Sequence, residues 1–226
     1  MNVKEFDMKK NTDQLVPDTY YHIYNRGING ENIFKSERNY FFFLEQFEKY
    51  INPVASTHAY CLLKNYFHFL IRTHSEDHLK SVFPLKEKYE SNKILSLQFS
   101  HLFNSYSQAL NKSQNRTGGL FETPFRRIAI KDEFYLLQLV YYIHFNPQKH
   151  HFTDDFKTYP YSSYIAYMNG SGKLLERSTI IELLGGQDKF ITHHATLNDE
   201  LFKKSDKIFI DFEPENTDRI LTLTGF

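Results

Sequence analysis

The segment AYCLLKNYFHFLI, residues 59–71, is the longest nearly apolar stretch of the chain, and Lys64 and Asn65 interrupt it. Its aromatic and branched side chains favour β-strands. The sequence therefore predicts two strands, over 58–63 and 66–72, around a turn at the two polar residues, or alternatively one bent strand. The stretch is far shorter than the roughly 18 apolar residues that a membrane span needs. We expect no membrane-embedded segment and no membrane partner.

The second half of this stretch has two different faces. Side chains alternate along a strand, so Phe67 and Phe69 point to one side and Tyr66 and His68 to the other. A histidine that projects from a sheet can ligate a metal ion or hydrogen-bond a neighbouring side chain. Spacing alone leaves both roles open for His68.

Patterns on either side of this segment predict further strands and helices. The predicted strands are 18–24, which runs into the turn Asn25-Arg26-Gly27, and a second after the loop that begins at 120; the predicted helices cover 36–52, 77–89, 95–111, 131–147 and 178–184. Beyond these, the chain reads as a polar tail. Because the helices do not alternate regularly with strands, the order predicts an α+β fold, with a small antiparallel sheet and helices packed on it.

The helix predicted over 131–147 carries two polar side chains of interest. Its apolar stripe is formed by Leu136, Leu139, Val140 and Ile143, and Pro147 is expected to end it. Tyr142 and Asn146 are four residues apart, so they share one flank of the helix beside this stripe. A phenol can act as a nucleophile and an amide oxygen can ligate a hard cation, whereas a packing tyrosine and a helix-end asparagine are the structural alternatives.

The composition is that of a soluble globular protein. The 226 residues are 41% hydrophobic and 24% charged, and the formal net charge is zero. The amino-terminal sequence MNVKEFDMKK lacks the apolar core of a signal peptide, and the single cysteine, Cys61, can form no internal disulfide. We therefore expect a reducing, cytoplasmic location.

Charge is distributed unevenly along the chain. Residues 61–150 contain twelve Lys and Arg against seven acidic residues, whereas the end of the chain after Asp199 is rich in acids. This asymmetry indicates a central basic surface and an acidic tail that folds back over it, although solvated helix faces give similar counts. Candidate phosphate contacts are Arg26, Arg126, Arg127 and Lys131.

Several motifs, taken in order, resemble those of one protein family. They are YHIYNRG (21–27), IFKSERNYFFFL with its helix (33–44), AYCLLKNYFHFLI (59–71), GGLFETPFRR (118–127), YYIHFNP (141–147) and YPYSSY (159–164). Over about residues 18–195 the chain resembles the REP-associated tyrosine transposases, the single-tyrosine branch of the HUH endonucleases among the bacterial insertion-sequence transposases. The resemblance implies a ferredoxin-like antiparallel sheet with packed helices. It also implies a transposase-like catalytic domain over 18–168, with an N-terminal segment (1–17) and a C-terminal extension (169–226) containing a short helix and an acidic tail.

The resemblance also implies an activity. In such transposases a tyrosine attacks single-stranded or hairpin DNA, which leaves a 5′-phosphotyrosine and a free 3′-hydroxyl. Tyr142 matches this nucleophile, and His68 and Asn146 match ligands of a Mg²⁺ or Mn²⁺ ion. The cations Arg26, Arg126, Arg127 and Lys131 would hold the DNA. Members work as monomers or homodimers, and the sequence does not choose between them.

The chain departs from the family at one metal ligand. Where the family has histidine, hydrophobe, histidine, this sequence has Tyr66-Phe67-His68. A neutral phenol, with a reference pKa of about 10, is a poor ligand for a divalent ion at neutral pH. His22 on the first strand compensates only if its side chain faces the same pocket.

Three interpretations follow from the sequence. The protein is a transposase-type enzyme that cuts and rejoins single-stranded DNA, or a degenerate or domesticated relative that binds structured DNA without cutting it. The third is an interaction domain that has lost DNA binding, for which the zero net charge is the support. Whether the protein is an enzyme therefore stays open at this stage.

Overall fold

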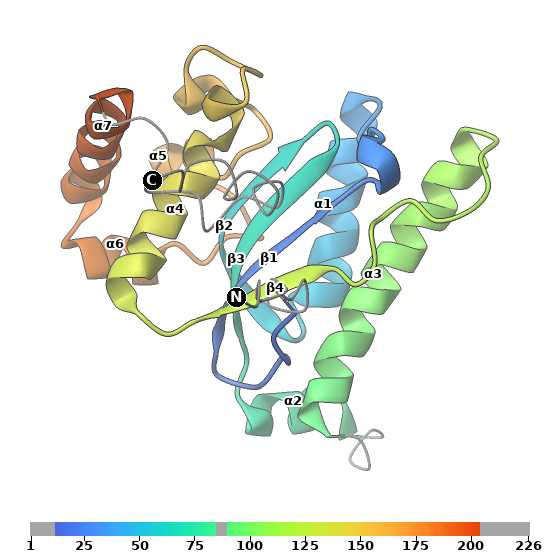
Figure 1. Cartoon of the computed structure of the whole chain (residues 1–226). Helices are drawn as coiled ribbons and strands as arrows, with labels where there is room; N and C mark the ends of the chain where they lie inside the picture. Colours follow the sequence, from blue (N-terminus) through green and yellow to red (C-terminus); the bar gives the residue numbers. More distant parts are fainter. Residues whose placement is uncertain (1–11, 85–89, 204–226) are drawn as a thin grey trace, which may run out of the picture.

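The computed structural model describes residues 12–84 and 90–203 (Figure 1). The last part of the helix predicted over 77–89 lies outside these residues. Most of the acidic end after Asp199, which we expect to fold over the basic surface, lies outside them as well. None of the helices in the described part of the chain is long and apolar enough to cross a membrane.

Four strands and a series of helices make up the described chain. The strands are β1 (Tyr20–Arg26), β2 (Ala55–Leu63), β3 (Tyr66–Thr73) and β4 (Arg126–Ile130). The helices are η2 (Ile28–Gly30), α1 (Glu37–Ile51), α2 (Glu76–Val82), α3 (Ser91–Ser113), α4 (Glu133–Lys149), η4 (Phe156–Thr158), α5 (Tyr164–Asn169), α6 (Ser178–Leu184) and α7 (Gln187–Lys203). Helix α6 has the bounds that the sequence predicts, 178–184.

The strands form one antiparallel sheet in the order β2-β3-β1-β4. With the chain order β1-α1-β2-β3-α3-β4, this is the ferredoxin-like arrangement, so the predicted α+β fold is confirmed. Of the two interpretations of segment 59–71, the hairpin is right, because Lys64 and Asn65 form the turn between β2 and β3. The hairpin supplies two of the four strands.

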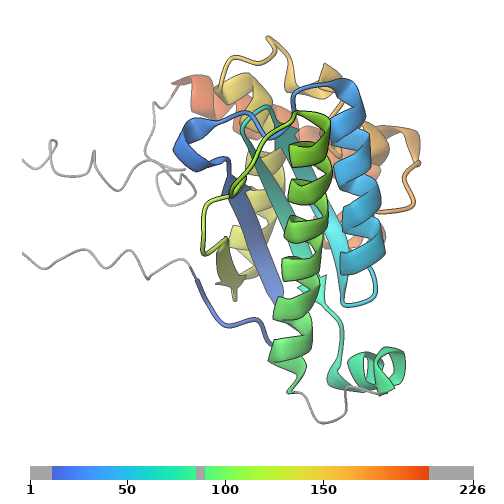
Figure 2. The ribbon, with the colours of Figure 1, turned by 90° about the vertical axis from the view of Figure 1, so that its right-hand side faces the viewer.

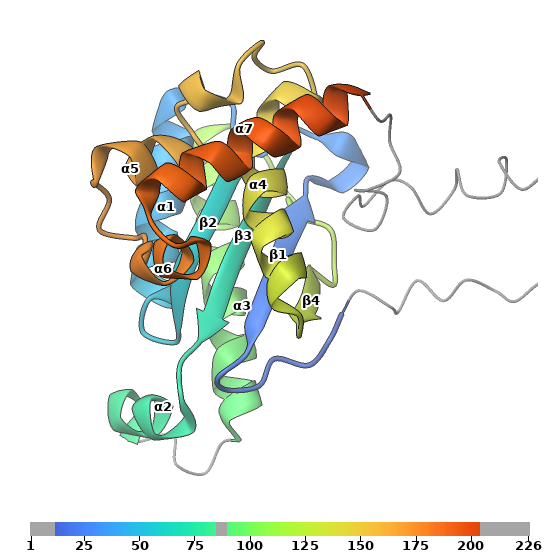
Figure 3. The ribbon, with the colours of Figure 1, turned by 90° about the vertical axis from the view of Figure 1, so that its left-hand side faces the viewer.

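Helices cover both faces of the sheet. Helices α1 and α3 pack on one face, which Figure 2 shows towards the viewer, and Phe67 and Phe69 of β3 point into that layer. Helix α4 packs on the other face, with α5, α6 and α7 around it (Figure 3). Alternation along β3 therefore places Tyr66 and His68 under α4, as predicted.

Capping residues fix the limits of α1. The side chain of Ser36 accepts from the backbone of Asn39, whose own side chain accepts from the backbone N–H of Ser36 at 3.1 Å. This reciprocal pair satisfies donors that the first helical turn leaves without a partner. The helix ends at Ile51, before Asn52 and Pro53, so the predicted limits are confirmed.

Helix α4 does not end at Pro147, and that prediction is wrong. It continues to Lys149, and the backbone N–H of His150 donates to the carbonyl of Asn146 at 3.1 Å. Proline removes one backbone hydrogen bond from a helix, but burial of the surrounding turn offsets this cost. From Leu139 to Pro147 every side chain of α4 is buried.

Segments from outside the sheet cover both of its edges. At the β4 edge, Thr12 forms a parallel bridge with Arg127, whose Nε also donates to the carbonyl of Asp13 at 2.6 Å. At the β2 edge, Ser162 forms an antiparallel bridge with Cys61. An exposed edge would present unpaired backbone donors and acceptors, and these segments occupy them.

Helix α7 was expected to be part of a polar tail, and this expectation is wrong. It packs on the side of α4 that faces away from the sheet (Figure 3). His194 Nε2 lies 2.9 Å from His144 Nδ1, and His144 Nε2 lies 2.8 Å from the hydroxyl of Ser163. This buried chain of polar groups joins α7, α4 and the segment before α5, so α4 is held from its outer side.

The histidine pair predicts a loss of stability in acid. Burial lowers the pKa of His194 to about 3 and that of His144 well below its usual range. Unfolded histidines titrate near pH 6.5, so the unfolded state binds more protons below that pH. We expect the free energy of unfolding to reach its full value above pH 6.5. Below that pH it should fall by up to about 1.4 kcal/mol per histidine for each pH unit. Urea unfolding measured across this range tests the slope. His194→Gln, which cannot titrate, should flatten it, and an unchanged slope would contradict the assignment.

Candidate functional site

A group of buried rings lies between the sheet and α4. His22 of β1 and His68 of β3 are fully buried, and His22 Nε2 lies 2.9 Å from His68 Nδ1. The ring of Tyr142, on α4, meets the ring of His68 nearly at a right angle, with centroids 5.5 Å apart. Tyr142 is also fully buried. Three residues that the sequence singled out therefore lie together, and His22 does face the pocket of His68.

A hydrogen bond between side chains joins β3 to α4 beside these rings. The hydroxyl of Tyr66 donates to Oδ1 of Asn146 at 2.8 Å. The Tyr66 ring also meets the ring of His68 edge-on at 5.4 Å and that of His150 at 5.5 Å. Tyr66 is half-buried and Asn146 is fully buried. Tyr66 thus fills the space between His68, Asn146 and His150.

Basic side chains surround the exposed end of this cluster. In the sheet register, Arg26 lies opposite Tyr66, and both line a small pocket of about 30 Å³ together with Arg126. On the α4 side, Lys149 Nζ lies 5.4 Å from the centre of the Tyr142 ring. We call Arg26, Arg126 and Lys149 the basic rim. An acid lies within the rim as well, because Glu122 pairs with Arg26 at 2.6 Å.

Two of the predicted DNA contacts lie elsewhere. Arg127 points to the opposite face of the sheet from Arg126, and its guanidinium binds the carbonyl of Asp13 and lies over the ring of Phe125. Burial lowers the pKa of Arg127. Lys131 is exposed but follows β4 at the end of the sheet away from Arg26. Neither cation belongs to the basic rim, and their role in DNA binding stays a prediction.

Sequence reasoning missed two residues at the end of α4. Lys149 and His150 lie beyond Pro147, which was expected to end the helix. Tyr142, Asn146 and His150 are spaced four apart, so a helix continued through the proline would have placed all three on one flank. This spacing could have identified His150, but the helix was predicted to end at Pro147.

The residues of this cluster do not fit a divalent cation well. The described residues contain no group of three or more His, Cys, Asp or Glu side chains that could hold a metal ion. The nitrogens of His22 and His68 that face one another lie 2.9 Å apart and share a hydrogen bond, which an ion bound by both would have to break. Asn146 Oδ1 already accepts from Tyr66, and Mg²⁺ binding ordinarily requires one or two carboxylates.

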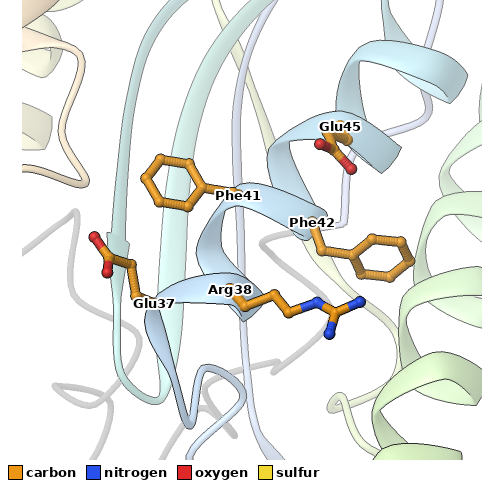
Figure 4. Close-up of a pocket in the computed structure, with 5 residues that line it drawn as sticks. All are labelled: Glu37, Arg38, Phe41, Phe42 and Glu45. Atoms are coloured by element: carbon orange, nitrogen blue, oxygen red, sulfur yellow. The ribbon is translucent and has the colours of Figure 1, made fainter.

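A second hollow lies on the other layer of the molecule, beside the first turns of α1. It has a volume of about 460 Å³ and is lined by Glu37, Arg38, Phe41, Phe42 and Glu45 (Figure 4). In this view Glu37 and Phe41 lie on one side of the helix, and Arg38 and Phe42 lie on the other. With two acids and one base, this hollow is a poor site for phosphate groups.

Comparison with known proteins identifies the class of fold that carries the site. No protein-family model matches the sequence, and no curated protein matches it. Among solved structures, the chain is similar to a REP-associated tyrosine transposase bound to a REP hairpin. The TM-score is 0.55 at 13% sequence identity, and the match covers 76% of this chain and 96% of that chain. The two proteins therefore share an α+β fold.

Removal of His22 should destabilise the site. His22→Ala breaks the contact with His68 Nδ1 in a fully buried setting, and we expect a loss of about 1–3 kcal/mol in the free energy of unfolding. Urea unfolding at neutral pH measures this loss. His101→Ala, on the exposed side of α3, is the control and should stay within about 0.5 kcal/mol of the unchanged protein. Equal values for the two variants would show that the histidine contact adds no stability.

Proposed function

We propose that the protein binds structured DNA, such as a hairpin, at the basic rim. The observation that carries the proposal is the position of Arg26, Arg126 and Lys149 around the exposed end of one cluster, although they come from β1, β4 and α4. Guanidinium and ammonium groups bind phosphate oxygens by charge and hydrogen bonding. Arg26 and Arg126 thus share one pocket, and Lys149 adds a third cation against the Tyr142 ring of the same cluster.

Two further features support this proposal. One protein of known structure with a similar fold is a REP-associated tyrosine transposase bound to a REP hairpin. The half-buried ring of Tyr66 lines the same pocket as Arg26 and Arg126, and an aromatic face next to cations suits an unpaired base beside a phosphate. The chain as a whole is neutral, so attraction must come from this local surface rather than from its net charge.

Hairpin binding should depend on the rim cations and on salt. For the double variant Arg126→Ala/Lys149→Ala we expect weaker binding to hairpin oligonucleotides of any sequence. The slope of log affinity against log salt should become shallower by about 1–2, because up to two phosphate contacts are lost. Fluorescence anisotropy over a range of salt concentrations measures both quantities.

The control for this experiment removes two cations from the opposite layer. Lys93→Ala/Lys112→Ala makes the same change in net charge on exposed positions of α3. Its affinity and salt slope should equal those of the unchanged protein. Absence of binding even at low salt would reject the proposal and favour an interaction domain without DNA binding.

A second candidate function is cleavage of the bound strand by Tyr142. The contact of the Tyr142 ring with His68 and with Lys149 favours it, because it places a base and a cation next to a phenol. In this reaction the phenol oxygen forms a bond to phosphorus, the bond to the 3′-oxygen breaks, and a 5′-phosphotyrosine and a 3′-hydroxyl result. Tyr142 is fully buried, so the site must open before DNA can reach it.

Covalent trapping tests the second candidate. The unchanged protein and Tyr142→Phe are incubated with end-labelled hairpin DNA, with manganese and separately with a chelator, and analysed on a denaturing gel. An adduct that requires Tyr142 would establish cleavage. Because Tyr142 is buried and the residues that the structure describes include no fitting set of metal ligands, we expect no adduct from either protein while hairpin binding persists.

A further inference from the structure

We infer that Tyr66 occupies the place of a divalent cation and that its contacts close the site as a metal-free latch between β3 and α4. The inference concerns the resting site alone and does not depend on DNA binding. In this arrangement, side chains that would otherwise bind an ion instead contact one another and hold α4 against the sheet.

The first argument is that the phenol fills the available space. His68, Asn146 and His150 each carry a nitrogen or oxygen atom of a type that can ligate a metal ion, and each contacts Tyr66. The ring of Tyr66 meets both imidazoles edge-on at 5.4 and 5.5 Å, and its hydroxyl lies 2.8 Å from the amide oxygen. An ion at this position would have to displace the Tyr66 side chain.

The second argument is that the amide group of Asn146 is not arranged to bind a cation. Asn146 Oδ1 accepts from Tyr66, and Asn146 Nδ2, which is buried, has no hydrogen-bond partner within the described part of the chain. An amide N–H₂ group repels a cation. The nearby carboxylate of Glu122, at the rim pocket, is already paired with the Arg26 guanidinium at 2.6 Å.

The third argument is mechanical. The bond from Tyr66 to Asn146 holds α4 from the sheet side, and the bond from His144 to His194 holds it from the α7 side. Helix α4 is therefore fixed from both sides through neutral groups. A chelator should leave this arrangement unchanged, whereas loss of the Tyr66 hydroxyl should loosen it.

Manganese binding tests the inference with a readout that is independent of activity. The full chain is titrated with Mn²⁺ and the free ion is measured by electron paramagnetic resonance, for the unchanged protein and for Tyr66→His, Tyr66→His/His68→Ala and Tyr66→Phe. We expect no His68-dependent binding to the unchanged protein or to Tyr66→Phe. Tyr66→His should bind Mn²⁺ at least roughly tenfold more tightly than the unchanged protein does. Adding His68→Ala to this variant should abolish the gain.

Thermal unfolding tests the latch itself. Tyr66→Phe keeps the ring and removes one hydrogen bond to a buried amide, so we expect the Tm to fall by about 2–4 °C. Tyr50→Phe, on α1 in the opposite layer, is the matched control and should leave the Tm unchanged. EDTA should change neither value.

Three results would overturn the inference. They are Mn²⁺ binding to the unchanged protein that His68→Ala removes, an unchanged Tm for Tyr66→Phe, and no binding to a folded Tyr66→His protein. The last result would show that Tyr66 is not what keeps the ion out. Hairpin binding is measured in parallel on the same samples. Its loss would contradict the proposed function, whereas the three results above would contradict only the inference about Tyr66.

Discussion

The exclusion of water from the second half of α4 is the constraint on which the rest of the structure depends. The sheet lies on one side of this helix and α7 on the other, so the polar groups that it carries lose contact with water and depend on partners inside the protein. His144 does so on the outer side, and Asn146 accepts from Tyr66 on the sheet side. The same constraint sets the position of Tyr142, which is buried beside His68. Packing, acid sensitivity and the closed state of the site thus have a common origin.

Local signals predicted the framework well. The strand pair around Lys64-Asn65 and the limits of α1 and α6 followed from apolar patterns and capping residues, which act over a few positions. Two failures have a physical cause. Pro147 is a helix breaker by intrinsic propensity, but burial on all sides kept the helix intact through it. Helix α7 has a largely polar sequence, and a few contacts such as that of His194 hold it.

The candidate site was predictable as a set of residues but not as an arrangement. Alternation along β3 placed Tyr66 and His68 under one helix, and the spacing of Tyr142 and Asn146 gave them one flank. Which atom meets which depends on the long-range register between β1, β3 and α4, and no local pattern contains that information. The sequence therefore could not show that His22 bonds to His68, that Tyr66 bonds to Asn146, or that Arg127 bonds to the carbonyl of Asp13.

The covered edges of the sheet limit how the protein can associate. Strand addition, by which many proteins bind peptides or copies of themselves, requires an open row of backbone groups. Here Thr12 occupies part of the β4 edge and Ser162 part of the β2 edge. Where these segments lie, extension of the sheet by a partner strand is disfavoured, and recognition there depends on side chains and surface charge.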